Sequence, residues 1–215
     1  YMNAGLFARI DALHCDQHAL GLTAEQARLL NQLHNDFVRA GARLKGADQQ
    51  RYAHVTERLA TLTTAFGQNV LADETGYRLE LKTEADFAGL PGFLRAAAGQ
   101  AAAERGLTNP VITLSRSLVV PFLTFSERRD LREAAWRAWT SRGEHAGAHD
   151  NRPLIREIMA LRCEQARLLG YGTYADYALD NTMARTQPAV MGLLDNVWQR
   201  AWPAVERERA ELVAE

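Results

Sequence analysis

Residues 160–177, with the sequence ALRCEQARLLGYGTYADY, decide the fold class of this chain. Apolar residues recur three and four positions apart up to Gly170, a residue type that favours the left-handed conformation after a helix. Thr173 then precedes Asp176 by three positions, which is the spacing of a capping box. The stretch therefore predicts a helix, a tight turn and a second helix.

The same apolar spacing predicts three helices in the first third of the chain. Asn3 can cap the first, Thr23 and Gln26 form a capping box for the second, and the third is the longest and ends at Gly76. The three apolar stripes are Leu6, Phe7, Ile10 and Leu13; Leu29, Leu30, Leu33 and Phe37; and Tyr52, Val55, Leu59, Leu62 and Phe66. The stripe of the long helix is expected to face inward.

A small β ribbon interrupts these helices. The period of two in residues 77–82 predicts a strand with one solvated face, and the β-branched run 111–114 predicts a second strand. An Ala-rich helix from near Pro91 to Gly106 separates the two. Pro121 blocks a long continuation of the second strand because it has no backbone donor. The predicted fold class is all-α, mostly helical, with a small β ribbon.

The chain is expected to return to helix from Ser126. Residues 143–151 form a predicted loop, in which Asp150 or Asn151 can cap the next helix. A last helix begins near Pro188 and should be kinked at Pro203, because a proline inside a helix removes a hydrogen bond and crowds the preceding turn. The inward face of this helix is expected to consist of Val190, Leu194, Val197, Trp198, Ala201 and Val205.

Length and composition limit the function classes. The 215 residues suffice for a sizeable core, and no repeat, linker or low-complexity tract divides them, so residues 1–215 are expected to form a single mostly helical lobe. The helical patterns that reach both ends predict a piece of a longer protein. The balance of 25 Lys and Arg against 26 Asp and Glu gives no reason to expect a nucleic-acid partner.

Nothing in the sequence predicts secretion or a membrane partner. No apolar run approaches the roughly 18 residues of a membrane span, and the first residues lack a basic segment followed by an apolar one. Cys15 and Cys163 are the only cysteines and lie far apart, which favours reduced thiols over a disulfide framework. A cytoplasmic protein is therefore expected.

Two histidine pairs have the four-residue spacing that places zinc ligands on one helix face. His14 and His18 form the better pair, but Cys15 stands where a zinc-peptidase motif has its glutamate, and the nearby Gly21 favours a polar helix end. His145 and His149 lie among glycines, so a solvated loop is expected there.

Other reactive residue types favour structural roles. His34 and His54 lie singly in predicted helices, where a histidine is usually hydrogen-bonded or on the surface. No serine has the Gly-x-Ser-x-Gly context of a nucleophile, and neither cysteine has a catalytic context; the serines considered are Ser115, Ser117, Ser126 and Ser141. No glycine-rich phosphate loop occurs either, so a nucleotide cofactor is not implied.

Aromatic and basic clusters complete the candidates. Four tryptophans could stack on a ligand, but packing in the core or against another lobe is the stronger expectation; they are Trp136, Trp139, Trp198 and Trp202. The arginines of residues 127–133 alternate with acidic residues, which predicts a solvated face with internal ion pairs; they are Arg128, Arg129 and Arg132. No residue is assigned as catalytic, cofactor-binding or metal-binding.

Residues 160–177 resemble the helix-turn-helix of the thimet oligopeptidase, oligopeptidase A and peptidyl-dipeptidase family of zinc metallopeptidases. Further matching segments lie on both sides of it, in the family's order, between Leu6 and Val205. They are residues 66–70, 131–133 with Trp136 and Ala138, 150–151 and 183–184, with Pro188, Val190 and Pro203. Residues 116–123 and 140–143 are more similar to the peptidyl-dipeptidase branch.

The resemblance implies that this chain is the N-terminal helical part of a two-lobed enzyme, whose deep channel admits short peptides. In that family a His-Glu-x-x-His helix and a later glutamate hold zinc. No residue here matches these ligands, so the chain itself is expected to bind no zinc and to be inactive alone. It would form channel wall and select substrates by size, beside a C-terminal catalytic lobe.

Two alternatives stay open. The chain could be a helical protein-interaction module without enzymatic activity, working through its apolar and aromatic faces. It could also be a small metalloenzyme that uses His14 and His18, which would require stoichiometric metal in the purified chain.

Overall fold

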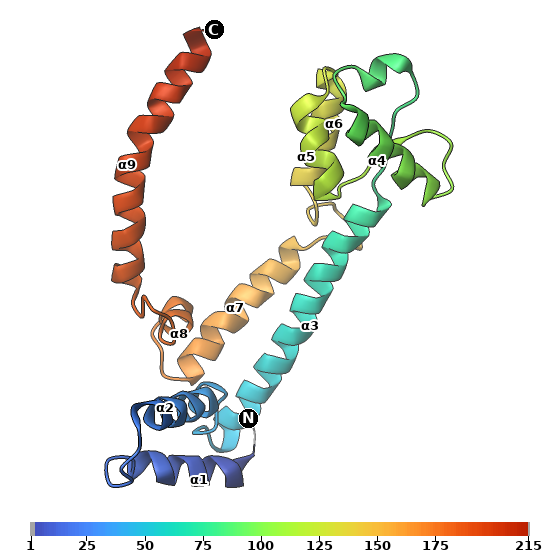
Figure 1. Ribbon diagram of the computed structural model, residues 1–215. Helices are drawn as coiled ribbons and strands as arrows, with labels where there is room; N and C mark the ends of the chain where they lie inside the picture. Colours follow the sequence, from blue (N-terminus) through green and yellow to red (C-terminus); the bar gives the residue numbers. More distant parts are fainter. Residues whose placement is uncertain (1–2, 215) are drawn as a thin grey trace. The chain divides into compact units, whose positions relative to one another are not determined.

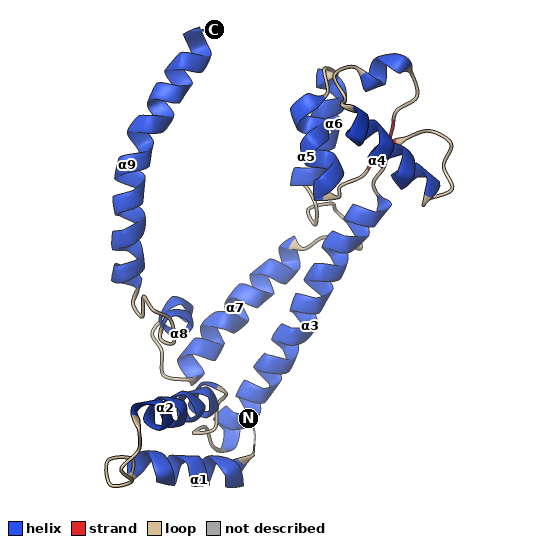
Figure 2. Ribbon diagram, viewed as in Figure 1, coloured by secondary structure: helices blue, strands red, loops and turns tan. Residues whose placement is uncertain are grey.

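The computed structural model describes residues 3–214, which form helices joined by short turns and one small ribbon (Figure 1). The elements are α1 (Ala4–Cys15), α2 (Ala24–Arg39), α3 (Gly46–Gly76), β1 (Leu79–Glu80), the 3-10 helix η1 (Glu84–Phe87), α4 (Gly92–Ala103), β2 (Val111–Ile112), α5 (Arg116–Phe125), α6 (Arg129–Thr140), α7 (Arg152–Leu168), α8 (Tyr174–Leu179) and α9 (Gln187–Ala214). Figure 2 shows helix as the dominant secondary structure. The predicted fold class is confirmed.

The chain divides into two compact units. The first consists of Tyr1–Arg58 with Ala160–Glu215, and the second of Leu59–Met159. The division falls within α3 and α7, so each of these helices contributes residues to both units.

The caps of the helices agree with the sequence patterns. The side chain of Asn3 accepts a hydrogen bond from the backbone N–H of Leu6, and Thr23 forms a capping box with Gln26 at the start of α2. A second capping box, formed by Thr173 and Asp176, begins α8. These bonds satisfy N–H groups that the first helical turn leaves without a partner.

The core of the second unit lies where α4, α5 and α6 meet the ribbon. The strands pair antiparallel with Leu79 opposite Ile112. A ribbon of these two segments was predicted, but it covers fewer residues than the sequence suggested. Phe122 and Leu94 are fully buried in this core. Burial of an apolar side chain of this size contributes roughly 1.5–3 kcal/mol.

Helix α5 was not expected from the sequence, because Pro121 lies inside it. Proline cannot donate a hydrogen bond and disfavours a helix interior. The helix nevertheless forms since Leu118, Val119 and Phe122 all point into the core, so tertiary burial outweighs local propensity. The expected return to helix at Ser126 is also wrong in detail, because Ser126 ends α5 and the next helix begins three residues later.

The side chain of Asn151 joins the loop before α7 to α3 through hydrogen bonds. This side chain is buried, donates to the carbonyl of Phe66 at 3.1 Å and accepts from the amide of Asn69 at 2.8 Å. The expected capping function falls partly to Asp150, whose carboxylate accepts from the backbone N–H of Arg152 at 2.9 Å. Residues 143–151 form a loop, as predicted.

The apolar face of α9 contradicts the sequence expectation. None of its described residues is buried, and Trp198 is 64% exposed. Trp198 stacks on Trp202 with ring centroids 5.3 Å apart, but within residues 3–214 this aromatic pair packs into no core. The long apolar stripe of α3 is buried in part, because Tyr52, Val55 and Leu62 are buried as predicted. Leu59 is only half-buried and Phe66 is exposed, so the stripe does not face inward along its whole length.

Candidate functional site

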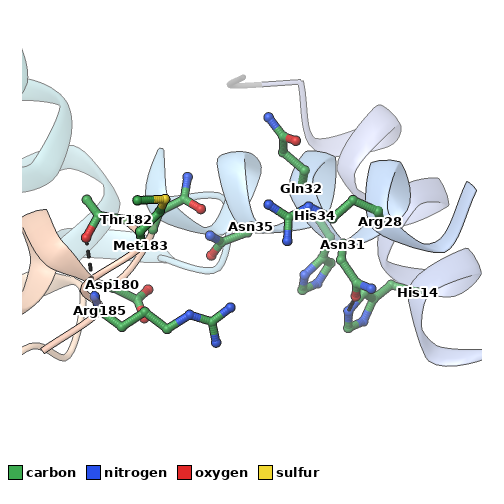
Figure 3. A pocket seen from close by; sticks show the side chains of 11 residues that line it. His14, Arg28, Asn31, Gln32, His34, Asn35, Asp180, Thr182, Met183 and Arg185 are labelled. Atoms are coloured by element: carbon green, nitrogen blue, oxygen red, sulfur yellow. Dashed lines mark hydrogen bonds between the residues drawn. The ribbon is translucent and has the colours of Figure 1, made fainter. Parts of the chain in front are cut away.

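A cavity with polar walls lies in the first unit, between α2 and the segment that follows α8. Its volume is about 670 Å³. This segment, residues 180–186, is called the α8–α9 turn below. Figure 3 shows side chains from α2 and from the turn around the cavity, with Arg185 extending from the turn toward the side occupied by α2. Its volume lies within the range typical of small-molecule sites.

One face of α2 supplies most of the polar wall. Arg28, Asn31, Gln32 and Asn35 stand at positions i, i+3, i+4 and i+7, so they lie on one side of the helix. The capping box at Thr23 fixes where α2 begins and thereby the direction in which this face points. The helix therefore presents three amide side chains and one guanidinium to the cavity.

A pair of stacked imidazoles forms the end of the cavity nearest α1. The rings of His14 and His34 are 3.8 Å apart and almost parallel. The Nε2 of His14 lies 3.0 Å from the amide oxygen of Asn31, and the Nε2 of His34 lies 2.9 Å from a carboxylate oxygen of Asp11. The hydrogen bond from His34 is the main cause that lowers the pKa of Asp11. Both rings are thus held in fixed orientations.

The α8–α9 turn forms the opposite wall. Asp180 accepts a hydrogen bond from the hydroxyl of Tyr171 at 2.7 Å and lies 3.6 Å from the guanidinium of Arg39, so a cation outside the cavity lining balances its charge. Arg185 has a backbone φ of 58°, a left-handed conformation that is uncommon for a residue with a side chain. Its backbone N–H donates to the hydroxyl of Thr182 at 3.3 Å.

The unpaired charges of the cavity are positive. Among residues 3–214, the guanidinium groups of Arg28 and Arg185 have no hydrogen-bond or ion-pair partner. Both side chains are exposed at the cavity mouth. The arrangement is suited to a ligand that carries a negative charge and several hydrogen-bonding groups.

Neither histidine pair named from the sequence lies on one helix face. Helix α1 ends at Cys15, so His18 lies in the following turn and does not share a helix face with His14. His145 and His149 lie in the predicted loop, about 4.0 and 3.9 Å from Asp73. In the described part of the chain, no three histidine, cysteine or acidic side chains are grouped so that they could hold a metal ion. The two remaining histidines differ, since His34 is buried and hydrogen-bonded whereas His54 is exposed on α3.

The other candidate nucleophiles take no part in the cavity. Ser115 and Ser117 bond to each other at 2.8 Å, and Ser126 is buried at the end of α5. Cys15 and Cys163 are both free and exposed.

The tryptophans and arginines divide between packing and surface. Trp139 packs against the core of the second unit, whereas Trp136 is exposed, as are the two tryptophans of α9. Arg128 pairs with Asp130 at 2.8 Å, which confirms one internal ion pair of this segment. Its second ion pair, with Asp86 at 2.5 Å, reaches outside the segment to η1 and was not predicted.

Sequence reasoning missed Arg28 and Arg185. The signal that could have found Arg28 is the polar spacing i, i+3, i+4 and i+7 on α2, which was overlooked in favour of the apolar stripe of the same helix. No local signal points to Arg185, because its place at the cavity depends on the packing of α8 and α2. No helix in residues 3–214 has the length and apolar character needed to span a membrane.

Comparison with known proteins agrees with the fold. Residues 122–214 match the model of Peptidase family M3. The chain is 35% identical to oligopeptidase A of Haemophilus influenzae over 212 residues, which is 97% of this chain and 31% of that protein. It is 34% identical to dipeptidyl carboxypeptidase of Escherichia coli over 215 residues, which is 100% of this chain and 32% of that protein.

A plant relative is more distant. The probable cytosolic oligopeptidase A of Arabidopsis thaliana is 30% identical over 193 residues, covering 86% of this chain and 27% of that protein. The chain thus spans about a third of the length of the curated relatives it matches. Identities of 35% and 34% to oligopeptidase A and dipeptidyl carboxypeptidase do not separate the two branches, so the peptidyl-dipeptidase branch stays a prediction. The chain belongs to peptidase family M3, the family that its sequence resembles.

Proposed function

We propose that this chain is the non-catalytic N-terminal lobe of a cytoplasmic zinc oligopeptidase that hydrolyses short peptides. The lobe forms part of the channel wall and excludes folded substrates, and a C-terminal lobe carries out the hydrolysis. Family membership supports the peptidase activity of the parent protein, since the relatives are named oligopeptidases and a dipeptidyl carboxypeptidase.

The observation that carries the proposal is the uncovered apolar face of α9. Trp198 and Trp202 stack in solvent, and Val197 and Val205 are exposed on the same helix. Soluble proteins rarely leave a contiguous apolar patch of this kind without a partner surface. In the parent protein, a second lobe that covers α9 would bury these side chains, and each tryptophan or valine fully buried contributes roughly 1.5–3 kcal/mol.

The residues of this chain do not fit the zinc of the parent. A catalytic zinc needs three protein ligands and an open position. The best pair in the sequence, His14 and His18, is separated by the end of α1, and His14 is already hydrogen-bonded to Asn31. The zinc ligands and the base that activates water must therefore come from another part of the parent, and this chain contributes walls and orientation.

The same face of α9 also favours a second candidate, a helical interaction module without enzymatic activity. The two candidates differ in what the native gene encodes. A region with His-Glu-x-x-His and a downstream glutamate in the same gene supports the peptidase, and a native protein without such a region supports the module.

The role of α9 can be tested in the parent protein with paired variants. Trp198→Ser and Trp202→Ser together should lower the melting temperature and the rate of peptide hydrolysis of the parent, because the covered face loses its aromatic pair. The matched control is Trp136→Ser, which removes a tryptophan exposed to a similar degree on α6. Equal behaviour of the α9 double variant and the unaltered parent would show that no lobe covers this face.

A further inference from the structure

We propose that the cavity between α2 and the α8–α9 turn binds short peptides through a carboxylate, held by Arg28 and Arg185. The choice of a peptide as ligand rests on the proposed function, whereas the preference for an anion follows from the cavity itself. The site would anchor peptides on this lobe.

Charge is the first argument. The acidic residue of the lining, Asp180, is already neutralised by Arg39 and bonded to the hydroxyl of Tyr171. The two guanidinium groups of the lining have no such counter-charge among residues 3–214. A guanidinium presents several N–H donors in a planar fork that matches a carboxylate, so an anionic group is the ligand that satisfies it best.

The amide side chains are the second argument. Asn31, Asn35 and Asn181 line the cavity beside the arginines. Each carboxamide offers both donors and an acceptor, which complements peptide groups that also donate and accept. An inorganic oxyanion such as phosphate offers mainly acceptors and would leave the carbonyl oxygens of Asn35 and Asn181 without a donor from the ligand, whereas that of Asn31 already bonds to His14.

The backbone of Arg185 is the third argument. A residue with a side chain is less stable than glycine in the left-handed region, because its Cβ crowds the backbone. The turn is held in this conformation by the hydrogen bond from the Arg185 N–H to Thr182. Glycine or asparagine would occupy this position with less strain. The presence of an arginine therefore favours a function for its side chain.

Binding to the 215-residue chain can be measured without any hydrolysis. The probes are acetyl-Ala-Ala-Ala with a free C-terminal carboxylate, the same peptide with a C-terminal amide, and acetyl-Ala-Asp-Ala-amide, titrated calorimetrically at low salt because surface charge is screened at high salt. Both peptides that carry a carboxylate should bind at least about tenfold more tightly than the neutral amide. Inorganic phosphate, the fourth probe, should bind more weakly than either.

Paired variants connect this preference to the arginines. Arg28→Gln with Arg185→Gln should abolish the difference between the carboxylate and amide peptides. The control is Arg9→Gln with Arg200→Gln, which replaces two exposed arginines of the same unit outside the cavity. It should leave the difference in affinity between the carboxylate and amide peptides unchanged. Circular dichroism establishes that each variant is folded.

Three outcomes would overturn the inference. They are equal binding of the amide and carboxylate peptides, absence of peptide binding to the folded chain, and tighter binding of phosphate than of any peptide. None of these outcomes would refute the proposed function, because zinc-dependent cleavage by the parent protein is measured separately. Conversely, a parent without peptidase activity would refute the proposed function even if the carboxylate preference were found.

Discussion

Replacing Asn151 by alanine should destabilise the second unit by about 2–4 kcal/mol. The side chain of Asn151 is 2% exposed and bridges the loop before α7 to α3 through two hydrogen bonds, to Phe66 at 3.1 Å and from Asn69 at 2.8 Å. Its loss removes the hydrogen bond to the Phe66 carbonyl, which contributes about 0.5–1.5 kcal/mol, and leaves the half-buried amide of Asn69 without this partner, which costs about 1–3 kcal/mol. At roughly 2–4 °C per kcal/mol for a chain of this size, the melting temperature should fall by about 5–15 °C.

A double-mutant cycle identifies the hydrogen bond between the two asparagines. Asn69→Ala should cost less than Asn151→Ala because it breaks one bond of the pair, and the double variant should cost less than the sum of the single changes. The surface control is Gln100→Ala on α4, whose side chain bonds only to the exposed Glu104 and should change stability by less than about 0.5 kcal/mol. Urea unfolding followed by circular dichroism supplies the free energies. An Asn151→Ala variant as stable as the Gln100→Ala control would refute the assigned role of this side chain.

Three further predictions concern pH, backbone conformation and metal content. The hydrogen bonds from the Arg152 guanidinium hold the pKa of Asp150 at about 2, below its usual value. The ionised Asp150 carboxylate therefore contributes its full stabilisation above about pH 4, and this contribution is lost as the pH falls toward 2. Asp150→Asn should flatten that part of the profile of unfolding free energy against pH, measured by urea unfolding. Gly89→Ala should destabilise the chain far more than Gly106→Ala, because both glycines have positive φ but only the new Cβ at position 89 would overlap the carbonyl oxygen of Phe125. Elemental analysis of the purified chain should find no stoichiometric zinc, and one tightly held zinc per chain would contradict this.

The helices whose ends carry specific residues were predictable from the sequence. Asn3, Thr23 and Thr173 all accept the backbone hydrogen bonds that their spacing indicated, because a cap is a local interaction within a few residues. The ribbon was predictable in place and pairing for the same reason, since residues 77–82 and 111–114 carry the β pattern themselves. The strands are shorter than predicted, because in each strand only two residues form pairs with the other strand.

Features that depend on distant contacts were not predictable. Pro121 argued against a helix locally, yet α5 forms because Phe122 and its neighbours are buried by α4 and α6. The periodicity of α9 indicated an apolar face correctly, but periodicity does not tell what covers that face, and within the described residues it is exposed. The candidate cavity was missed because its lining comes from α2 and from the α8–α9 turn, which are far apart in the sequence.

The division between wall and catalyst is tested most directly by one assay on two proteins. A quenched fluorogenic peptide is offered to the purified 215-residue chain and to the full-length parent, each with and without a chelator, and then with zinc restored. We expect no cleavage by the 215-residue chain under any condition, and cleavage by the parent that the chelator abolishes and zinc restores. Chelator-sensitive cleavage by the 215-residue chain alone would contradict the proposed function, and so would a parent protein that cleaves no peptide.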